Sequence, residues 1–102
     1  MDGTMFVACV EHLNGHIEYL RVYEANGTKG TWVTLSRAFV VALVKGGISC
    51  STYFKDPKTG DFVVGAQVHV VYVNGLAYLR TDKDATAKDN LGSLPELSAC
   101  PF

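Results

Sequence analysis

DFVVGAQVHVVYV, residues 61–73, is the longest strand-like stretch of the sequence, and we expect the fold to form around it. Side chains alternate between the two faces of a strand, which puts Phe62 and Val64 on one face and Val63 and Val71 on the other. Both faces are mostly apolar, as is typical of a strand that is covered on both sides. We therefore expect a central strand that is covered on both faces, by a helix on one and by a second copy of the chain on the other.

Two Asn-Gly pairs, Asn14-Gly15 and Asn74-Gly75, predict tight hairpins of the two-residue type. The first joins strands over residues 5–13 and 16–24, and the second joins residues 61–73 to a last strand at 76–81. If Leu13 pairs with His16 and the register continues unbroken, the first hairpin has two distinct faces. One carries Val7, Cys9, Glu11, Leu13, His16, Glu18, Leu20 and Val22; the other carries Phe6, Ala8, Val10, His12, Ile17, Tyr19, Arg21 and Tyr23.

A helix is expected to follow Trp32-Val33, capped by the hydroxyl of Thr34 or Ser36 and ending near Lys45. Gly46-Gly47 terminates it, with one glycine in the left-handed conformation. The predicted buried stripe is Phe39, Val40, Leu43 and Val44, although a strand over residues 39–44 is the alternative. A third strand at 48–55 completes the order ββαβββ. The fold class is α+β: an antiparallel sheet of about five strands with one helix packed on it.

The composition predicts one globular domain over residues 1–102, with a core at about 5–97 and a loosely ordered tail at 98–102. Nine basic and ten acidic residues give a net charge of −1, which argues against duplex nucleic acid as a partner. We read no signal peptide and no membrane span. Cys9, Cys50 and Cys100 are widely spaced, so we expect reduced thiols and a cytoplasmic protein, with Cys9 and Cys50 as core residues.

No catalytic, cofactor or metal signature is complete. The predicted pairing puts His12 and His16 on opposite faces, and the calcium-loop-like run from Asp82 has Ala87 where glycine is needed. There is no nucleophile elbow and no phosphate-binding glycine loop. We therefore expect a protein that is not an enzyme and that has no catalytic residue, bound metal or cofactor.

A binding function is the interpretation that remains. Of three arginines, Arg21 and Arg80 lie on or at the end of predicted strands, beside Tyr19, Tyr23 and Tyr78. A guanidinium can bond a phosphate while an aromatic ring stacks on a base, so this pairing suits a planar ligand with a phosphate. The alternative is that these side chains simply cover the edge of a sheet.

The stretch from Gly75 to Pro95 carries a family resemblance. YLRT at 78–81, then DNL at 89–91 and LP at 94–95, resembles the end of a small bacterial and phage domain family of unknown function. The helix entry at 32–36, Gly46-Gly47 and the strand around Tyr53 also resemble that family. The layout is similar, more distantly, to phage Thoeris anti-defence sponges, which are oligomers that sequester cyclic ADP-ribose-type or cyclic oligonucleotide signals without hydrolysing them.

That second resemblance implies a homo-oligomer in a bacterial host cell, with a small nucleotide-type ligand bound at a protomer interface. Arg80 would then clamp phosphate, Asn90 beside Asp89 would bond a base edge, and Tyr78 or Tyr19 would stack. The turn at 89–91 has a plainer explanation, in which Asp and Asn side chains bond their own backbone. Two other functions stay open: a module that homodimerises through its sheet without a ligand, and a platform for single-stranded nucleic acid, which the near-neutral charge disfavours.

Overall fold

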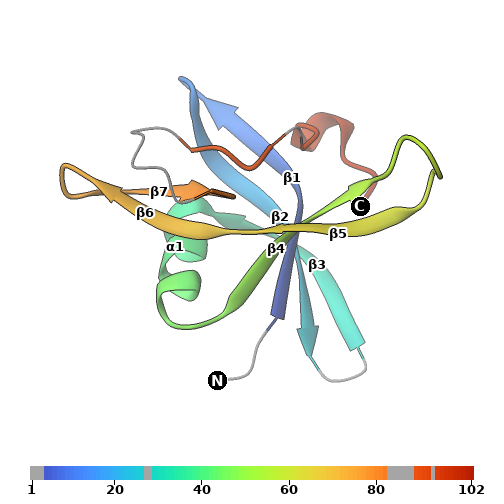
Figure 1. Cartoon of the computed structure of the whole chain (residues 1–102), viewed down its shortest axis with the longest axis horizontal. Helices are drawn as coiled ribbons and strands as arrows, with labels where there is room; N and C mark the ends of the chain where they lie inside the picture. The colour runs from blue at the N-terminus through green and yellow to red at the C-terminus, as the bar shows by residue number, and fades with distance from the viewer. Residues whose placement is uncertain (1–3, 27–28, 83–88, 93) are drawn as a thin grey trace.

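The computed structural model describes residues 4–26, 29–82, 89–92 and 94–102 of the chain. Seven strands, one α-helix and one short 3-10 helix make up these segments (Figure 1). In chain order they are β1 (Thr4–Leu13), β2 (His16–Asn26), β3 (Lys29–Ser36), α1 (Arg37–Lys45), β4 (Ser49–Lys55), β5 (Phe62–Gln67), β6 (His69–Val73), β7 (Leu76–Arg80) and η1 (Leu97–Ala99).

The main sheet has five strands in the order β3-β2-β1-β4-β5, and β6 and β7 form a separate two-stranded ribbon. The α+β class is confirmed, but the purely antiparallel sheet and the order ββαβββ are wrong. β1 and β4 run parallel, because α1 carries the chain from β3 on one edge back to the far side of β1. The stretch around Trp32, expected to lead into the helix, is the added strand β3, which pairs along β2.

The stretch 61–73 is divided between the two sheets. β5 pairs with β4 at the edge of the main sheet, and β6 pairs with β7. At the division, the Val68 N–H donates to the Cys50 carbonyl at 2.7 Å, and the Val68 side chain is buried. Figure 1 shows β5 and β6 as one long band across the molecule. The prediction of a central, doubly covered strand is therefore wrong, and Val64 is 56% exposed.

Both Asn-Gly turns are confirmed. Asn14 and Gly15 have φ of 53° and 81°, Asn74 and Gly75 have 52° and 80°, and Leu13 pairs with His16. The predicted faces of the first hairpin are wrong, because the register shifts twice. Ala8 in β1 and Glu18 in β2 are β-bulges that have no partner on the opposite strand. Val10 therefore lies opposite Leu20 rather than opposite Tyr19.

The helix is close to its prediction at both ends. The Ser36 hydroxyl accepts a hydrogen bond from the Phe39 N–H, Gly46 is the C-cap, and Gly47 has φ of 101°. The buried stripe is narrower than expected, since Val40 is fully buried but Phe39 is 52% exposed. A helix of nine residues presents only one side chain fully to the core, with partly buried neighbours beside it.

The core lies between the main sheet and the layer formed by α1 and the β6–β7 ribbon. Its buried hydrophobic residues come from β1, β2, α1, β4 and β7 and from the chain at positions 68 and 91: Met5, Val7, Val10, Ile17, Leu20, Val22, Val40, Cys50, Val68, Leu79 and Leu91. One face of the main sheet is thereby covered. The other face, described below, is where the candidate ligand surface lies.

The C-terminal residues return along β1. The Val10 N–H donates to the Pro95 carbonyl at 3.0 Å, Glu96 bridges to Val10 in parallel, and η1 follows. Cys100 then forms a disulfide with Cys9, across 91 residues of sequence. The expectation of reduced thiols is therefore wrong for this pair. In the structure, Cys100 and Phe102 both contact residues of the main sheet, and the loosely ordered tail stays a prediction. Cys50 is a buried free thiol, and burial raises its pKa to about 12.

Candidate functional site

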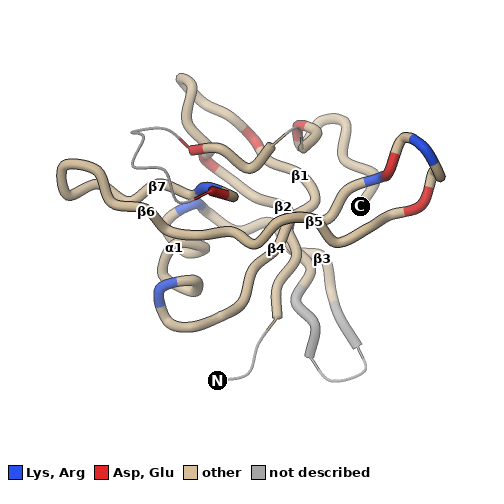
Figure 2. Tube along the Cα trace, viewed as in Figure 1, with Lys and Arg blue, Asp and Glu red and all other residues tan. Residues whose placement is uncertain are grey.

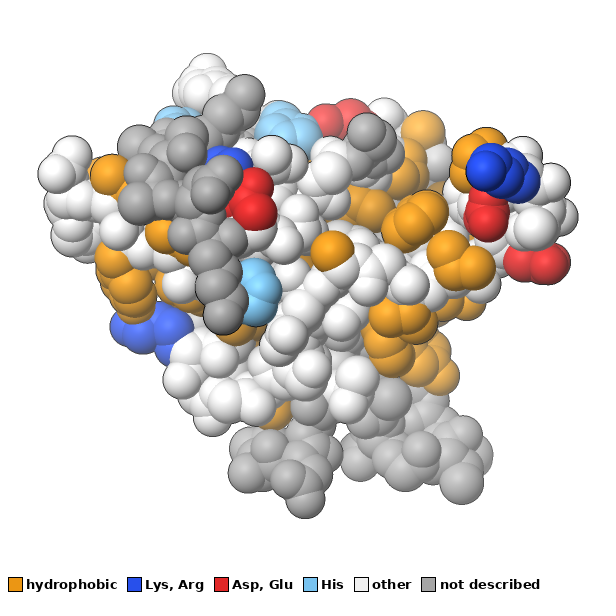
Figure 3. Space-filling model, viewed as in Figure 1, with side chains coloured by type: hydrophobic (Ala, Val, Ile, Leu, Met, Phe, Trp, Pro, Cys, Tyr) orange, Lys and Arg blue, Asp and Glu red, His pale blue; other side chains and the backbone are white. Residues whose placement is uncertain are grey.

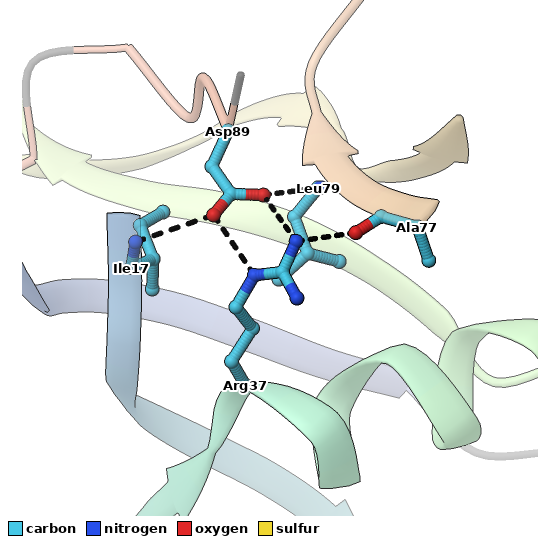
Figure 4. A network of polar contacts seen from close by, with 5 residues as sticks. All are labelled: Ile17, Arg37, Ala77, Leu79 and Asp89. Atoms are coloured by element: carbon cyan, nitrogen blue, oxygen red, sulfur yellow. Dashed lines mark hydrogen bonds and ion pairs between the residues drawn. The ribbon is translucent and has the colours of Figure 1, made fainter. Parts of the chain in front are cut away.

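Four of the six predicted site residues lie together around the end of β7. Asp89 is at the centre and its carboxylate is almost completely buried (Figure 4). It accepts hydrogen bonds from the backbone N–H groups of Leu79 at 2.8 Å and Ile17 at 3.2 Å. These bonds join β7 and β2, which belong to different sheets.

Arg37, the first residue of α1, supplies the countercharge. Its Nε and Nη2 reach the two Asp89 oxygens at 2.9 and 3.0 Å, a two-point pairing of guanidinium with carboxylate. Nη2 also donates to the Ala77 carbonyl, and the guanidinium lies 5.7 Å from the centre of the Tyr78 ring. The carboxylate therefore accepts four hydrogen bonds, which is about its full capacity. A ligand would have to displace one of them to reach it.

Arg37 was the one arginine that the sequence reasoning did not consider. No local signal marked the pair, because Asp89 lies in the polar run 81–93 and nothing in that run shows that its carboxylate is buried and needs a cation. The distance of 52 residues between the partners conceals which cation that is.

Arg80 and Asn90 are neighbours beside this pair. Arg80 is 6% exposed and bonds Asp82 through Nε at 2.6 Å and Nη2 at 3.0 Å. The Asn90 backbone extends β7 by two bonds, to the Leu79 carbonyl and from the Thr81 N–H. Its side-chain oxygen accepts from the Gly92 N–H at 3.0 Å, so this residue follows the plainer explanation of the turn.

Tyr19 and Arg21 lie apart from this group, on β2. Tyr19 is 42% exposed and pairs with Ser36 of β3. Arg21 pairs with Thr34, and its Nη1 donates to the Thr34 hydroxyl at 3.1 Å. The structure therefore does not bring the six predicted residues into one site.

A second constellation, which the sequence reasoning missed, lies on the face of the main sheet opposite the core. Each of the five strands contributes one aromatic side chain to it, and we call these five residues the aromatic cluster: Phe6, Tyr23, Trp32, Tyr53 and Phe62. Met5, Val7, Val22 and Thr52, which adjoin cluster residues in the sequence, are all buried, so alternation turns the rings to the other face.

The rings of the aromatic cluster are close enough to act as one surface. Ring centres are 5.2 Å apart for Tyr23 and Trp32, 6.1 Å for Phe6 and Tyr53, and 6.2 Å for Trp32 and Tyr53. Tyr53 and Phe62 are stacked at 5.5 Å. Figure 3 shows hydrophobic side chains gathered near the β4–β5 hairpin, whose two strands carry Tyr53 and Phe62.

Phe102 lies on the aromatic cluster. Its ring is stacked on Trp32 at 4.1 Å with an interplanar angle of 15°, and meets Phe62 edge-on at 5.0 Å. Its backbone oxygen accepts a hydrogen bond from Arg21 Nε at 3.3 Å. Four rings of the cluster and Phe102 enclose a hollow of about 380 Å³, lined by Phe6, Tyr23, Trp32, Tyr53 and Phe102.

A larger cleft, of about 870 Å³, adjoins this hollow and shares Tyr53 and Phe102 with it. Its lining is mostly apolar, and the 75–95 stretch forms one wall through Thr81, Leu91, Gly92, Leu94 and Pro95. Figure 2 shows charged residues of both signs at the turn between β4 and β5. Lys55 and Pro57 of this region line the cleft. The volume suits a small molecule, since ligand sites are commonly apolar clefts of about 300–1,000 Å³.

The polar contact between His12 and Glu96 holds the C-terminal residues at the other end of this region. The imidazole Nδ1 lies 2.5 Å from the carboxylate, and the His12 backbone N–H bonds the same group. These hydrogen bonds lower the pKa of Glu96. Within the described segments, no three His, Cys, Asp or Glu side chains are grouped so as to hold a metal, and no helix there is long and apolar enough to cross a membrane.

Comparison with known proteins identifies one family. The model of the family described as "Protein of unknown function (DUF3892)" matches residues 6–95, which is most of the chain. No curated protein and no solved structure matches the chain.

Proposed function

The chain belongs to the DUF3892 family of proteins of unknown function, and we propose that it is a non-enzymatic binding protein that captures a small nucleotide-type molecule. The binding surface in this proposal is the aromatic cluster with Arg21 at its side, continued into the adjoining cleft. The observation that carries it is the convergence of five rings, one from each strand, on one face of the sheet.

Stacking is the interaction that such a surface offers best. A base stacked on an aromatic side chain gains about 1–3 kcal/mol, largely independent of which base it is. Trp32 has the largest ring of the cluster, and a planar ring already lies on it at 4.1 Å. An aromatic ligand in that position would replace the ring of Phe102.

Arg21 provides the polar part of recognition. Its Nε points to an oxygen acceptor, the Phe102 carbonyl, beside the stacked ring. Because the guanidinium is already charged, a phosphate oxygen in that place would add an ion pair to the hydrogen bond. One arginine beside an apolar cleft favours a small ligand with few phosphates over a long polyanion, which agrees with the net charge of −1.

The prediction that Arg80 clamps phosphate, that Asn90 bonds a base edge and that Tyr78 or Tyr19 stacks stays a prediction. In our proposal Asp89, Asn90 and Arg80 have a different role, which is to hold the wall of the cleft between Thr81 and Leu94. Oligomerisation, the bacterial cytoplasm and an anti-defence role as a sponge are further parts of the proposal, which rest on the resemblance alone.

A thermal-shift screen tests the proposal. Purified protein is heated with cyclic di- and trinucleotides and with cyclic ADP-ribose isomers, each with and without a dithiol reductant. A ligand at roughly 100 times its Kd adds about 2.7 kcal/mol of stability, which for this size is a Tm rise on the order of 10 °C. A hit recovered unchanged after heat release supports capture, and a hit recovered cleaved contradicts the non-enzymatic part.

Matched variants locate the site. We expect Arg21→Ala to abolish the shift and Lys45→Ala, which removes the same charge at the far end of α1, to preserve it. If Arg80→Ala abolishes the shift in a folded protein while Arg21→Ala does not, the ligand binds at the end of β7 and the proposed surface is wrong.

The second candidate is a protein-interaction module that homodimerises through its sheet and binds no small molecule. The exposure of Phe54, Phe62 and Val64 at the β4–β5 edge favours it, because burying apolar side chains drives association. Light scattering after size exclusion gives the mass. A stable dimer with a flat ligand screen would support this candidate, and a monomer would reject it.

A further inference from the structure

We propose that residues 100–102 are a redox-controlled occupant of the aromatic cluster: the Cys9–Cys100 disulfide holds Phe102 over Trp32, and its reduction opens the surface to a ligand. The identity of the incoming ligand rests on the function proposed above. The opening itself does not, because it concerns only contacts within the chain.

Phe102 has both features of the ligand class that the surface would accept. It presents a planar ring, stacked on Trp32, and an oxygen acceptor, bonded to Arg21 Nε at 3.3 Å. A ligand and Phe102 therefore compete for the same ring face and the same donor. The structure described here is the occupied form.

The disulfide is the covalent contact that keeps residues 100–102 beside the aromatic cluster. Upstream of it, the chain is bound to β1 through the Pro95 carbonyl, the Glu96 bridge and the pair of Glu96 with His12. Those bonds do not involve Cys100, so residues 94–99 keep their place when the disulfide is broken. Residues 100–102 would then be held by non-covalent contacts alone, against the conformational entropy of the freed residues. These contacts are the Phe102 ring against Trp32, Phe62 and Tyr53, the Arg21 hydrogen bond, and the Cys100 N–H bond to the Leu97 carbonyl.

The reduction is a two-electron exchange with a dithiol of the thioredoxin or glutaredoxin type. Cys9 is fully buried and Cys100 is partly exposed, so the attacking thiolate reaches the Cys100 sulfur. That attack forms a mixed disulfide and releases Cys9 as a thiolate, which takes up a proton. The second thiol of the reductant then displaces Cys100, which leaves two protein thiols and an oxidised reductant.

Cys50 takes no part in this exchange. It is buried, and burial holds its thiol in the protonated, unreactive form. After reduction, no covalent bond holds Phe102 near Trp32, and a ligand can displace its ring.

The only tryptophan of the sequence, Trp32, reports the opening directly. We would measure its emission and its quenching by acrylamide in the full-length protein before and after addition of dithiothreitol, without any nucleotide. We expect the quenching constant to rise and the emission to move to longer wavelength on reduction. An unchanged Trp32 would overturn the proposal.

Two variants separate release of the segment from unfolding. Cys100→Ser should resemble the reduced protein and show no further response to dithiothreitol. Phe102→Ala keeps the disulfide, so its Trp32 should be open to acrylamide in the oxidised form and indifferent to reduction. If Phe102→Ala leaves quenching as in the parent chain, Phe102 does not cover Trp32 and the proposal fails.

Mass spectrometry after alkylation with and without reduction completes the test. We expect Cys9 and Cys100 to be protected until the reductant is added, whereas labelling of Cys100 without reductant would show that the segment is not held by a disulfide. These tests use no ligand, so a nucleotide screen without a hit does not affect them. Conversely, if Trp32 does not become exposed on reduction, the nucleotide screen still tests the proposed binding function.

Discussion

Asp89 and Arg37 show how a single residue pair determines which elements meet. The carboxylate joins β2 and β7 through backbone N–H groups, and the guanidinium adds the start of α1. A buried charge is costly unless it is paired, so loss of either side chain leaves the other as an uncompensated charge. The Asp-Asn-Leu turn was recognisable in the sequence as a special feature, but not the identity of its partner, because pairing across 52 residues leaves no local pattern.

Removing the Asp89 carboxylate should destabilise the protein strongly. Asp89→Ala leaves the Arg37 guanidinium and two backbone N–H groups without their acceptor, and we expect a loss of about 3–5 kcal/mol in the free energy of unfolding. Urea denaturation measures it. The matched control is Asp61→Ala, an exposed aspartate, which should change stability by less than about 0.5 kcal/mol. Equal effects for the two variants would mean that the buried pair contributes little.

The Cys50 thiol should be inert in the folded protein. Its pKa of about 12 lies above the ordinary value of 9.0, so at pH 8 it is protonated and should resist iodoacetamide until the protein unfolds. A raised pKa means that the folded state retains the proton. The contribution of the protonated Cys50 thiol to the free energy of unfolding is therefore fully present below pH 9, and it declines as the pH rises towards 12. Rapid labelling of Cys50 at pH 8 in folded protein would contradict this assignment.

Among the helices and strands, the sequence predicts turns and helix ends correctly, but it does not predict which distant strands pair. The Asn-Gly turns, the Ser36 cap and the glycine exit from α1 depend on residues within a few positions, and the structure confirms them. The parallel pairing of β1 with β4 and the division of residues 61–73 depend on the whole chain. Apolar side chains on both faces of β5 indicated a central strand, but part of that apolar surface belongs to the cleft instead.

Gly65 marks a close approach between β5 and β4. A Cβ added there would lie 2.4 Å from the Thr52 hydroxyl oxygen and 2.5 Å from a Phe54 ring carbon. Thr52 is buried and cannot easily move, so Gly65→Ala should cost about 1–3 kcal/mol in stability, as overpacking commonly does. Gln67→Ala, at an exposed position of the same strand, is the comparison for urea denaturation. A Gly65→Ala protein as stable as its parent would show that the two strands adjust freely.

At the scale of the whole molecule, the main sheet has two different faces. One packs against α1 and the β6–β7 ribbon to form the core, and the other carries the aromatic cluster, partly covered by residues 100–102. The cluster was hidden in the sequence because its five rings come from five strands, and only the strand order brings them together. The disulfide was hidden for the same reason, since Cys9 and Cys100 are at opposite ends of the chain.

The emission of Trp32 during ligand titration tests most directly whether the aromatic cluster binds a nucleotide-type ligand. The titration uses cyclic di-AMP and cyclic ADP-ribose with the dithiol-reduced protein, and with Arg21→Ala as the matched variant. We expect saturable quenching of Trp32 by at least one of the two compounds, weakened or lost in Arg21→Ala. Binding at the aromatic cluster is contradicted if neither compound changes the emission of Trp32. It is also contradicted if a compound raises the Tm while the emission stays constant, because the ligand would then bind elsewhere.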